Sequence, residues 1–441
     1  MKRLAFVALS IIMISFLNYT IGAICDRFYF VEGFQCLEPQ IFDIVFLSLI
    51  VIVPSFFLPT DDGGETMVLW YVYFFHIMSA VSGILYLSQI NSDYYIFTLF
   101  FVVTFTIGSR IIANLQSRFV VVNLDIKTVE YGAVAVSALA LATLLTVFSI
   151  TFILPSITDV YGVRSEYKAA IETTSVRILS YLPIWSGYVF AVVCIFLATI
   201  SYFRGRTVLA LGIFALAATH SLAVFSLAAY KSVAFIFLIV LVLLFVLSRS
   251  KSPLLTFLCG LLGVGIFALL IAAAGFNDDG YYHWVRRSMI APGMNVAYHL
   301  ELFGLWNSQS YPDAPRLVSE TFYGTSGSAN TGMLGAGIGR GGLLGVAMQM
   351  LVFFVFLAVL KIATRNVPPA FSMALCLPTA YAFTNSSATT TLVTYGAAFI
   401  AIFLFLWGSA LATRSRTLLL RSGTGSDRYF GNWIQTRVPG R

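Results

Sequence analysis

The stretch KSVAFIFLIVLVLLFVLSRSKSPLLTFLCGLLGVGIFALLIAAA, residues 231–274, decides the fold class of this chain. It contains two apolar runs, 232–248 and 253–274, separated only by a short basic turn. An α-helix needs about 17–25 mostly apolar residues to cross the hydrocarbon core of a bilayer. The stretch therefore predicts two membrane-spanning helices joined by a short loop.

The composition of the whole chain extends this prediction. Of the 441 residues, 59% are hydrophobic and only 10% are charged, and the mean hydropathy is +0.89. Soluble domains carry about 25% charged residues, so these values exclude a soluble enzyme, a disordered chain and a disulfide-built secreted module. We expect an all-α polytopic membrane protein with about twelve transmembrane helices. The expected spans lie near residues 4–24, 40–59, 67–90, 94–112, 132–154, 179–201, 207–227, 232–248, 253–274, 341–363, 367–385 and 390–411.

The positions of lysine and arginine predict the orientation of these spans. Cytoplasmic loops of membrane proteins are enriched in Lys and Arg, and most of the 26 such residues fall on one side if the N-terminus is cytoplasmic. We therefore expect a single transmembrane domain, 1–411, with both termini in the cytoplasm and a flexible basic tail at 412–441. The first apolar run exceeds the length of a signal-peptide core, so we expect it to be retained as a helix.

Two large external loops are expected near 155–178 and 275–340, and most of the external cations lie in them or in one tight turn. These cations are Arg164, Lys168, Arg177, Lys231, Arg286, Arg287, Arg316 and Arg340. One interpretation is that long loops cross the membrane regardless of their charge. The alternative, which we favour, is a cationic external cavity that binds an anionic ligand.

The loop 275–340 is the most polar stretch of the chain and holds the candidate chemistry. A guanidinium stays charged and binds phosphate oxygens through its planar fork, so arginines there would stabilise a departing diphosphate. A nearby carboxylate or imidazole would deprotonate an attacking hydroxyl. The available groups are Glu320, His299, His283 and Asp313.

Each of these candidates also has a purely structural interpretation. Arg286 and Arg287 are suited to anchoring an interfacial helix over 284–303 to lipid phosphates, with Leu300 facing the lipid. Arg316 and Glu320 are four residues apart, which is also the spacing of a helical ion pair. The chain has no spacing of His, Cys or carboxylate residues typical of a metal site and no nucleotide-binding glycine motif, so we expect neither a metal nor a cofactor.

Cys25 and Cys36 both fall outside in the predicted topology. An oxidising compartment would permit a disulfide between them, and the equal alternative is two unpaired thiols at the membrane boundary. No basic run with interleaved aromatic residues occurs outside the short tail, so nucleic acid is not an expected partner.

The order of spans and two large external loops with arginines resembles the O-antigen polymerase family of bacterial membrane enzymes. The family's loop motif, an arginine, ten residues and a glycine, is similar to Arg316 and Gly327 here. Arg286-Arg287 followed by Pro292, and the tight turn that holds Lys231, also resemble the family. The first loop departs from the pattern, because the glycine position beyond Arg164 is occupied by Ser175.

The resemblance implies an inverting, metal-independent glycosyltransferase with a GT-C-like fold at the periplasmic face of the bacterial inner membrane. It would join oligosaccharide repeat units carried on undecaprenyl diphosphate during lipopolysaccharide biosynthesis, together with a chain-length-determining co-polymerase. Glu320, and after it His299, would be the general base, and Arg316 would act at the reacting diphosphate. The substrate-binding residues implied are Arg164, Arg177, Lys231, Arg286, Arg287 and Asn330.

Two other functions remain open at this point. O-antigen ligases share a His-Asn pair before a glycine- and leucine-rich span, but this chain has Ala329-Asn330 at that position. A transporter or flippase of lipid-linked oligosaccharides would also need cations, although transporters more often bind their substrates at broken helices near the membrane midplane. The sequence shows no obvious pair of broken helices, so we favour the polymerase.

Overall fold

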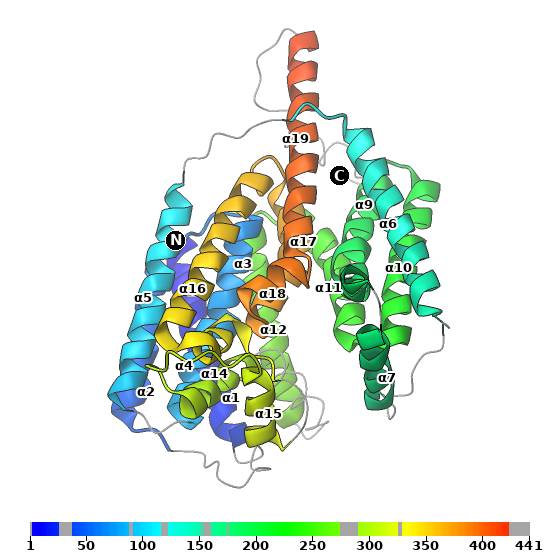
Figure 1. Ribbon diagram of the computed structural model, residues 1–441. Helices are drawn as coiled ribbons and strands as arrows, with labels where there is room; N and C mark the ends of the chain where they lie inside the picture. Colours follow the sequence, from blue (N-terminus) through cyan, green and yellow to red (C-terminus); the bar gives the residue numbers. More distant parts are fainter. Residues whose placement is uncertain are drawn as a thin grey trace. The chain divides into compact units, whose positions relative to one another are not determined.

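The computed structural model of the protein describes residues 2–25, 38–87, 91–115, 122–150, 152, 160–173, 176–273, 290–324 and 329–422 (Figure 1). Every regular element within these ranges is helical, which confirms the predicted all-α fold. In chain order the elements are α1 (Lys2–Cys25), α2 (Ile41–Ile52), η2 (Val53–Phe56), α3 (Gly64–Val72), η3 (Tyr73–Met78), α4 (Ser79–Leu87), α5 (Ser92–Asn114), α6 (Ile126–Phe148), α7 (Val160–Thr173), η4 (Arg177–Tyr181), α8 (Leu182–Trp185), η5 (Ser186–Phe190), α9 (Ala191–Phe203), α10 (Thr207–Ala228), α11 (Lys231–Ser248), α12 (Pro253–Ala273), α14 (Ala291–Phe303), α15 (Ala314–Tyr323), α16 (Gly332–Thr364), α17 (Pro369–Asn385), α18 (Ala388–Val393) and α19 (Ala397–Ser422).

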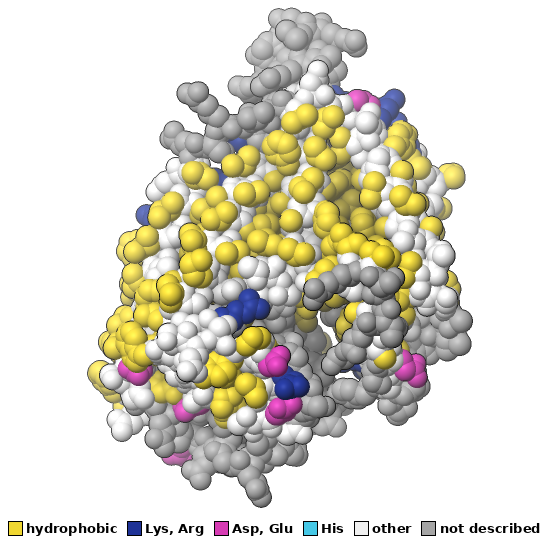
Figure 2. All heavy atoms as spheres, viewed as in Figure 1, with side chains coloured by type: hydrophobic (Ala, Val, Ile, Leu, Met, Phe, Trp, Pro, Cys, Tyr) yellow, Lys and Arg dark blue, Asp and Glu magenta, His cyan; other side chains and the backbone are white. Residues whose placement is uncertain are grey.

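Ten of the described helical segments are long and apolar enough to cross a membrane, as expected of a multi-pass membrane protein. Hydrophobic side chains lie exposed along the long helices, as Figure 2 shows, and lipid tails would cover such surfaces. Two of the twelve expected spans are shorter in the structure. The span expected at 40–59 forms α2 and η2, and the span expected at 367–385 forms the 17-residue α17, which contains Pro378.

The chain divides into two compact units, which we describe separately. Unit 1 comprises residues 1–116, 252–359 and 380–391, and unit 2 comprises residues 117–251, 360–379 and 392–441. The last helix, α19, continues to Ser422, beyond the predicted start of the tail at 412. Residues 423–441 of that tail lie outside the described residues.

The centre of unit 1 is the helical segment Gly64–Leu87, which consists of α3, η3 and α4 and is buried along its whole apolar window. Trp70 packs its ring against Phe6 of α1, with 4.8 Å between the ring centroids, and its indole N–H donates to the carbonyl of Pro59 at 2.7 Å. The middle of this segment, η3, is a π-helix that carries the buried His76. Such wide turns are frequent at functional sites.

The helix α14 lies against α4 with the two backbones in close approach. A side chain at Gly293 would overlap the carbonyl group of Ser79, and a Cβ at Gly83 would lie 2.9 Å from the carbonyl oxygen of Gly293. The expected interfacial helix with Leu300 facing lipid is therefore wrong for this segment, because α14 is buried and Leu300 is only 5% exposed. Small residues on both helices permit this contact, and the hydrophobic pattern of α14 alone does not reveal it.

Unit 2 is built around α9, which packs against α10, α6 and α11. Phe196 of α9 meets the ring of Trp407 edge-on, with 4.9 Å between the centroids. A largely buried ion pair of 2.6 Å joins Arg204, just after α9, to Glu130 of α6, and the indole N–H of Trp407 donates to the same carboxylate at 3.2 Å. The carboxylate of Glu130 thereby joins α6, the end of α9 and α19 within unit 2.

The contact between α14 and α4 yields a test of the fold. Gly293→Ala should lower the free energy of unfolding by about 1–3 kcal/mol, because the added methyl group has no space. Gly260→Ala on α12 is the matched control, since a Cβ there meets nothing within 4 Å and alanine favours the helix. Thermal unfolding in detergent measures both variants, and an unchanged melting temperature for Gly293→Ala would contradict the close contact.

Candidate functional site

The short helix α15 presents the polar residues of the long loop on one face. It begins after Asp313 with Pro315 in its first turn, where proline is well tolerated, and it ends at Gly324, which has a left-handed φ of +59°. Its inner face packs on α14, where the rings of Phe322 and Tyr298 stack with 4.5 Å between their centroids. Within the described residues, the outer face of α15 is exposed at Arg316 and Glu320.

Arg316 occupies that outer face with its side chain 57% exposed. Its Nε lies 3.5 Å from Glu320 Oε1, and one terminal nitrogen lies 3.9 Å from Asp313 Oδ2. The helical ion pair of the structural interpretation is thus present, and exposed pairs of this kind contribute little to stability, so the guanidinium exchanges partners at low cost.

The structure places His299 in the interior of unit 1, away from solvent. The ring is fully buried in α14, with Nδ1 2.5 Å from the backbone oxygen of Asn295 and with no described hydrogen-bond partner at Nε2. Gly335 and Gly339 of α16 pass beside the ring. Burial lowers the pKa of His299 to about 4, against a smaller opposite effect of the hydrogen bond to Asn295. His299 is therefore neutral at pH 7 and does not face the surface that holds Glu320.

Asn295, also on α14, joins the polar residues around His299 into one network. Its side chain accepts a hydrogen bond from the Tyr323 hydroxyl at 2.8 Å and donates one to the backbone oxygen of Asn330. The side-chain amide of Asn330 in turn donates to Asn385 Oδ1 at 3.1 Å. The predicted substrate-binding residue Asn330 thus links α15 and α14 to the end of α17, and sequence reasoning missed Asn295 and Asn385.

Unit 1 contains broken helices that the sequence analysis did not detect. The first part of α16, from Gly332, is separated from the remainder by the non-helical Gly341 and Gly342. His76 Nε2 accepts a hydrogen bond from the backbone N–H of Leu334 at 3.1 Å, near the start of this first part. The glycine-rich run at 324–345 was the available signal, but only the backbone angles reveal the break.

A second interruption separates α17 from α18 at Ser386 and Ser387. The backbone N–H of Ala388 donates to Gln349 Oε1 at 2.7 Å, and the Ser387 hydroxyl accepts from the backbone N–H of Thr390 at 3.2 Å. The new helix start is therefore capped by side chains, which is how an interrupted helix satisfies its free N–H groups inside an apolar protein.

In unit 2 the predicted cations Arg164 and Lys231 lie at one place, although they are far apart in sequence. A terminal nitrogen of Arg164 on α7 donates to the backbone oxygen of Ala229 at 3.2 Å, and its guanidinium carbon lies 5.8 Å from the ring centre of Tyr230. Lys231 follows as the exposed first residue of α11. Burial raises the pKa of Tyr230, and Arg164 opposes this rise by favouring the phenolate.

Several predicted residues are not described. Arg286, Arg287, His283 and Gly327 lie outside the described residues, as does Cys36, so the Cys25–Cys36 disulfide stays a prediction. Arg177 begins η4, but its side chain is not described. Within the described part of the chain, no group of three or more His, Cys, Asp or Glu side chains could hold a metal ion.

Comparisons with protein-family models, with curated proteins and with solved structures found no match to this chain.

The burial of His299 predicts a contribution to acid sensitivity. The histidine pKa is near 6.5 in the unfolded chain and about 4 in the folded protein, so the unfolded state binds more protons between these values. Stability should therefore decrease as the pH falls from 6.5 towards 4, by at most about 1.4 kcal/mol per pH unit for this group. Thermal unfolding of His299→Gln across this range should show a shallower decrease than the wild type. Parallel curves for the two proteins would contradict a buried neutral imidazole.

Proposed function

We propose that this protein is an O-antigen polymerase, an inverting membrane glycosyltransferase that joins oligosaccharide repeat units carried on undecaprenyl diphosphate. The observation that carries the proposal is the exposed pair of Arg316 and Glu320 on α15. This pair combines a cation suited to phosphate with a carboxylate suited to a hydroxyl proton. It lies on a polar helix that packs on the buried helix α14 of unit 1.

The reaction needs stabilisation of a leaving group and removal of one proton. The acceptor hydroxyl oxygen attacks the anomeric carbon of the donor, and the bond from that carbon to the diphosphate oxygen breaks with its electron pair going to the diphosphate. Arg316 would leave its weak pairing with Glu320 and bind the diphosphate oxygens, whose charge increases in the transition state. The freed carboxylate of Glu320 would accept the hydroxyl proton.

The cations of unit 2 extend the proposal. Arg164 and Lys231 meet at the turn between α10 and α11, and we assign them to binding the anionic part of a substrate. In the proposed orientation the reaction takes place at the periplasmic face of the inner membrane, on a GT-C-like scaffold and without a metal or cofactor. A chain-length-determining co-polymerase is the proposed protein partner.

A second candidate is a transporter of lipid-linked oligosaccharides. The breaks in α16 and between α17 and α18 favour it, because transporters bind substrates at interrupted helices. The exposed position of the Arg316–Glu320 pair favours the polymerase over the transporter. The two functions predict different products in a strain that lacks the gene. Loss of a polymerase leaves single lipid-linked repeat units on the periplasmic side, whereas loss of a transporter leaves the lipid-linked units on the cytoplasmic side.

Arg316→Ala should reduce polymer formation about 100-fold or more, because removing one fixed charge-stabilising donor typically costs that much in rate. Arg316→Lys should recover little activity if the planar fork is required. The readout is the ladder of glycan chains in the complemented deletion strain, with protein amounts measured by immunoblot. Arg249→Ala, an exposed arginine at the end of α11, is the control. A full ladder with both Arg316 variants would refute the diphosphate contact.

The substitution Glu320→Gln tests whether Glu320 is the general base or only the ion-pair partner of Arg316. Asp313→Asn is its matched control, since both carboxylates lie within 4 Å of Arg316. If Glu320 accepts the proton, only Glu320→Gln should abolish the ladder, while Asp313→Asn should reduce it by less than about threefold, the modest effect expected of an exposed pair. Equal effects of the two substitutions would show that Glu320 is not the base.

A further inference from the structure

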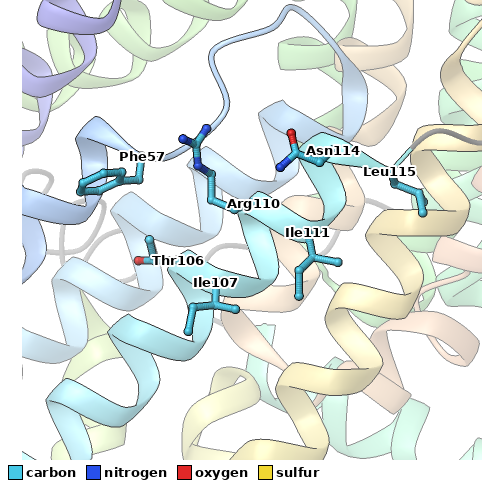
Figure 3. A pocket seen from close by; sticks show the side chains of 7 residues that line it. All are labelled: Phe57, Thr106, Ile107, Arg110, Ile111, Asn114 and Leu115. Carbon is cyan, nitrogen blue, oxygen red and sulfur yellow. The ribbon is translucent and has the colours of Figure 1, made fainter.

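A hollow on the surface of unit 1 lies between Phe57, directly after η2, and the last two turns of α5 (Figure 3). Its volume is about 560 Å³, which lies within the range of small-molecule sites, roughly 300–1,000 Å³. The lining residues are Phe57, Thr106, Ile107, Arg110, Ile111, Asn114 and Leu115. None of them belongs to the site proposed for glycosyl transfer.

The α5 residues of this lining form two parallel stripes, because side chains four apart lie on the same face of a helix. Thr106, Arg110 and Asn114 make a polar stripe, which extends over about 12 Å at 1.5 Å per residue. Ile107 and Ile111 begin the apolar stripe beside it. In Figure 3 the guanidinium of Arg110 and the amide of Asn114 extend to the same side of α5, while Ile107 and Ile111 point to the other.

Among the described residues that line the hollow, Arg110 is the only charged one. No hydrogen bond or ion pair is described for it, and none of the described residues that line the hollow is a carboxylate. The apolar walls are open to the surroundings, with Ile107 55% and Ile111 62% exposed. The site therefore offers a single positive charge at the end of a membrane-spanning helix and an apolar surface directly below it.

We propose that this hollow binds an anionic phospholipid. The phosphate would be held by the Arg110 guanidinium and the Asn114 amide, and one acyl chain would lie along Ile107, Ile111 and the ring of Phe57. Basic hollows at the cytoplasmic ends of helices suit anionic lipid headgroups, and the Lys and Arg distribution predicts this end of α5 to be cytoplasmic. The inference does not depend on the proposed glycosyl transfer.

The test uses the full-length protein, purified in detergent and stripped of lipid, with native mass spectrometry counting the lipids bound. The probes are phosphatidylglycerol and phosphatidylcholine with identical acyl chains. Arg110→Ala removes the charge, and Ile111→Trp fills the hollow without altering the charge. Arg206→Ala, at another exposed arginine, is the matched control for a general loss of positive charge.

The wild type should bind its first phosphatidylglycerol more tightly than phosphatidylcholine. Arg110→Ala should weaken phosphatidylglycerol binding about fivefold, which corresponds to about 1 kcal/mol for one basic residue at an anionic headgroup. Ile111→Trp should weaken binding of both lipids, and Arg206→Ala should change neither.

Three results would overturn the proposal. The Arg110→Ala variant could bind phosphatidylglycerol as tightly as the wild type. Arg110 would then only extend its charged group to the headgroup region, without binding a particular lipid. The wild type could bind both lipids equally. Finally, millimolar inorganic phosphate could displace the phosphatidylglycerol, which would identify a soluble anion as the occupant of the hollow.

Discussion

The arrangement of unit 1 depends on the close approach of α14 to α4. Gly293 and Gly83 allow the two backbones to meet beside Ser79, where any larger residue would overlap a carbonyl group. This contact holds a segment from the polar loop against the most deeply buried span of the unit. Without a hydrophobic driving force between helices in lipid, such packing of small residues is a main source of helix association. The position of α15 on α14 follows from it.

A polar layer inside an apolar protein must also satisfy its own hydrogen bonds, because water does not compete for them there. The described network does this by chaining Tyr323, Asn295, Asn330 and Asn385. His76 Nε2 accepts from the backbone N–H of Leu334 near the start of α16. The network connects α14, α15 and α17 and leaves Arg316 and Glu320 on its outer side. Arg316 and Glu320 would therefore bind a ligand while the hydrogen-bonded network holds the helices beneath them in place.

The sequence predicted the features that depend on long apolar runs. The predicted spans 232–248 and 253–274, for example, form the helices α11 and α12. A run of apolar residues as long as the bilayer is thick is a strong signal of a membrane-spanning helix. The spacing of Arg316 and Glu320 also indicated their ion pair, whereas the helix α15 itself was not predicted. The burial of α14, the break at Gly341 and Gly342 and the meeting of Arg164 with the turn before Lys231 arise from tertiary contacts. Apart from the glycine-rich run at 324–345, which precedes and contains the break, the sequence of a single chain carries no pattern that reveals such contacts.

We propose that this membrane protein polymerises lipid-linked sugars through an arginine that binds diphosphate and a carboxylate that accepts a proton. The most direct measurement incubates the purified full-length protein in liposomes with a synthetic undecaprenyl-diphosphate-linked repeat unit and a metal chelator, followed by separation of the products by size. The account predicts a ladder of lengthening glycans that disappears when Arg316 is replaced by alanine. Tight binding of the lipid-linked unit with no product longer than one repeat, even after a co-polymerase is added, would contradict it.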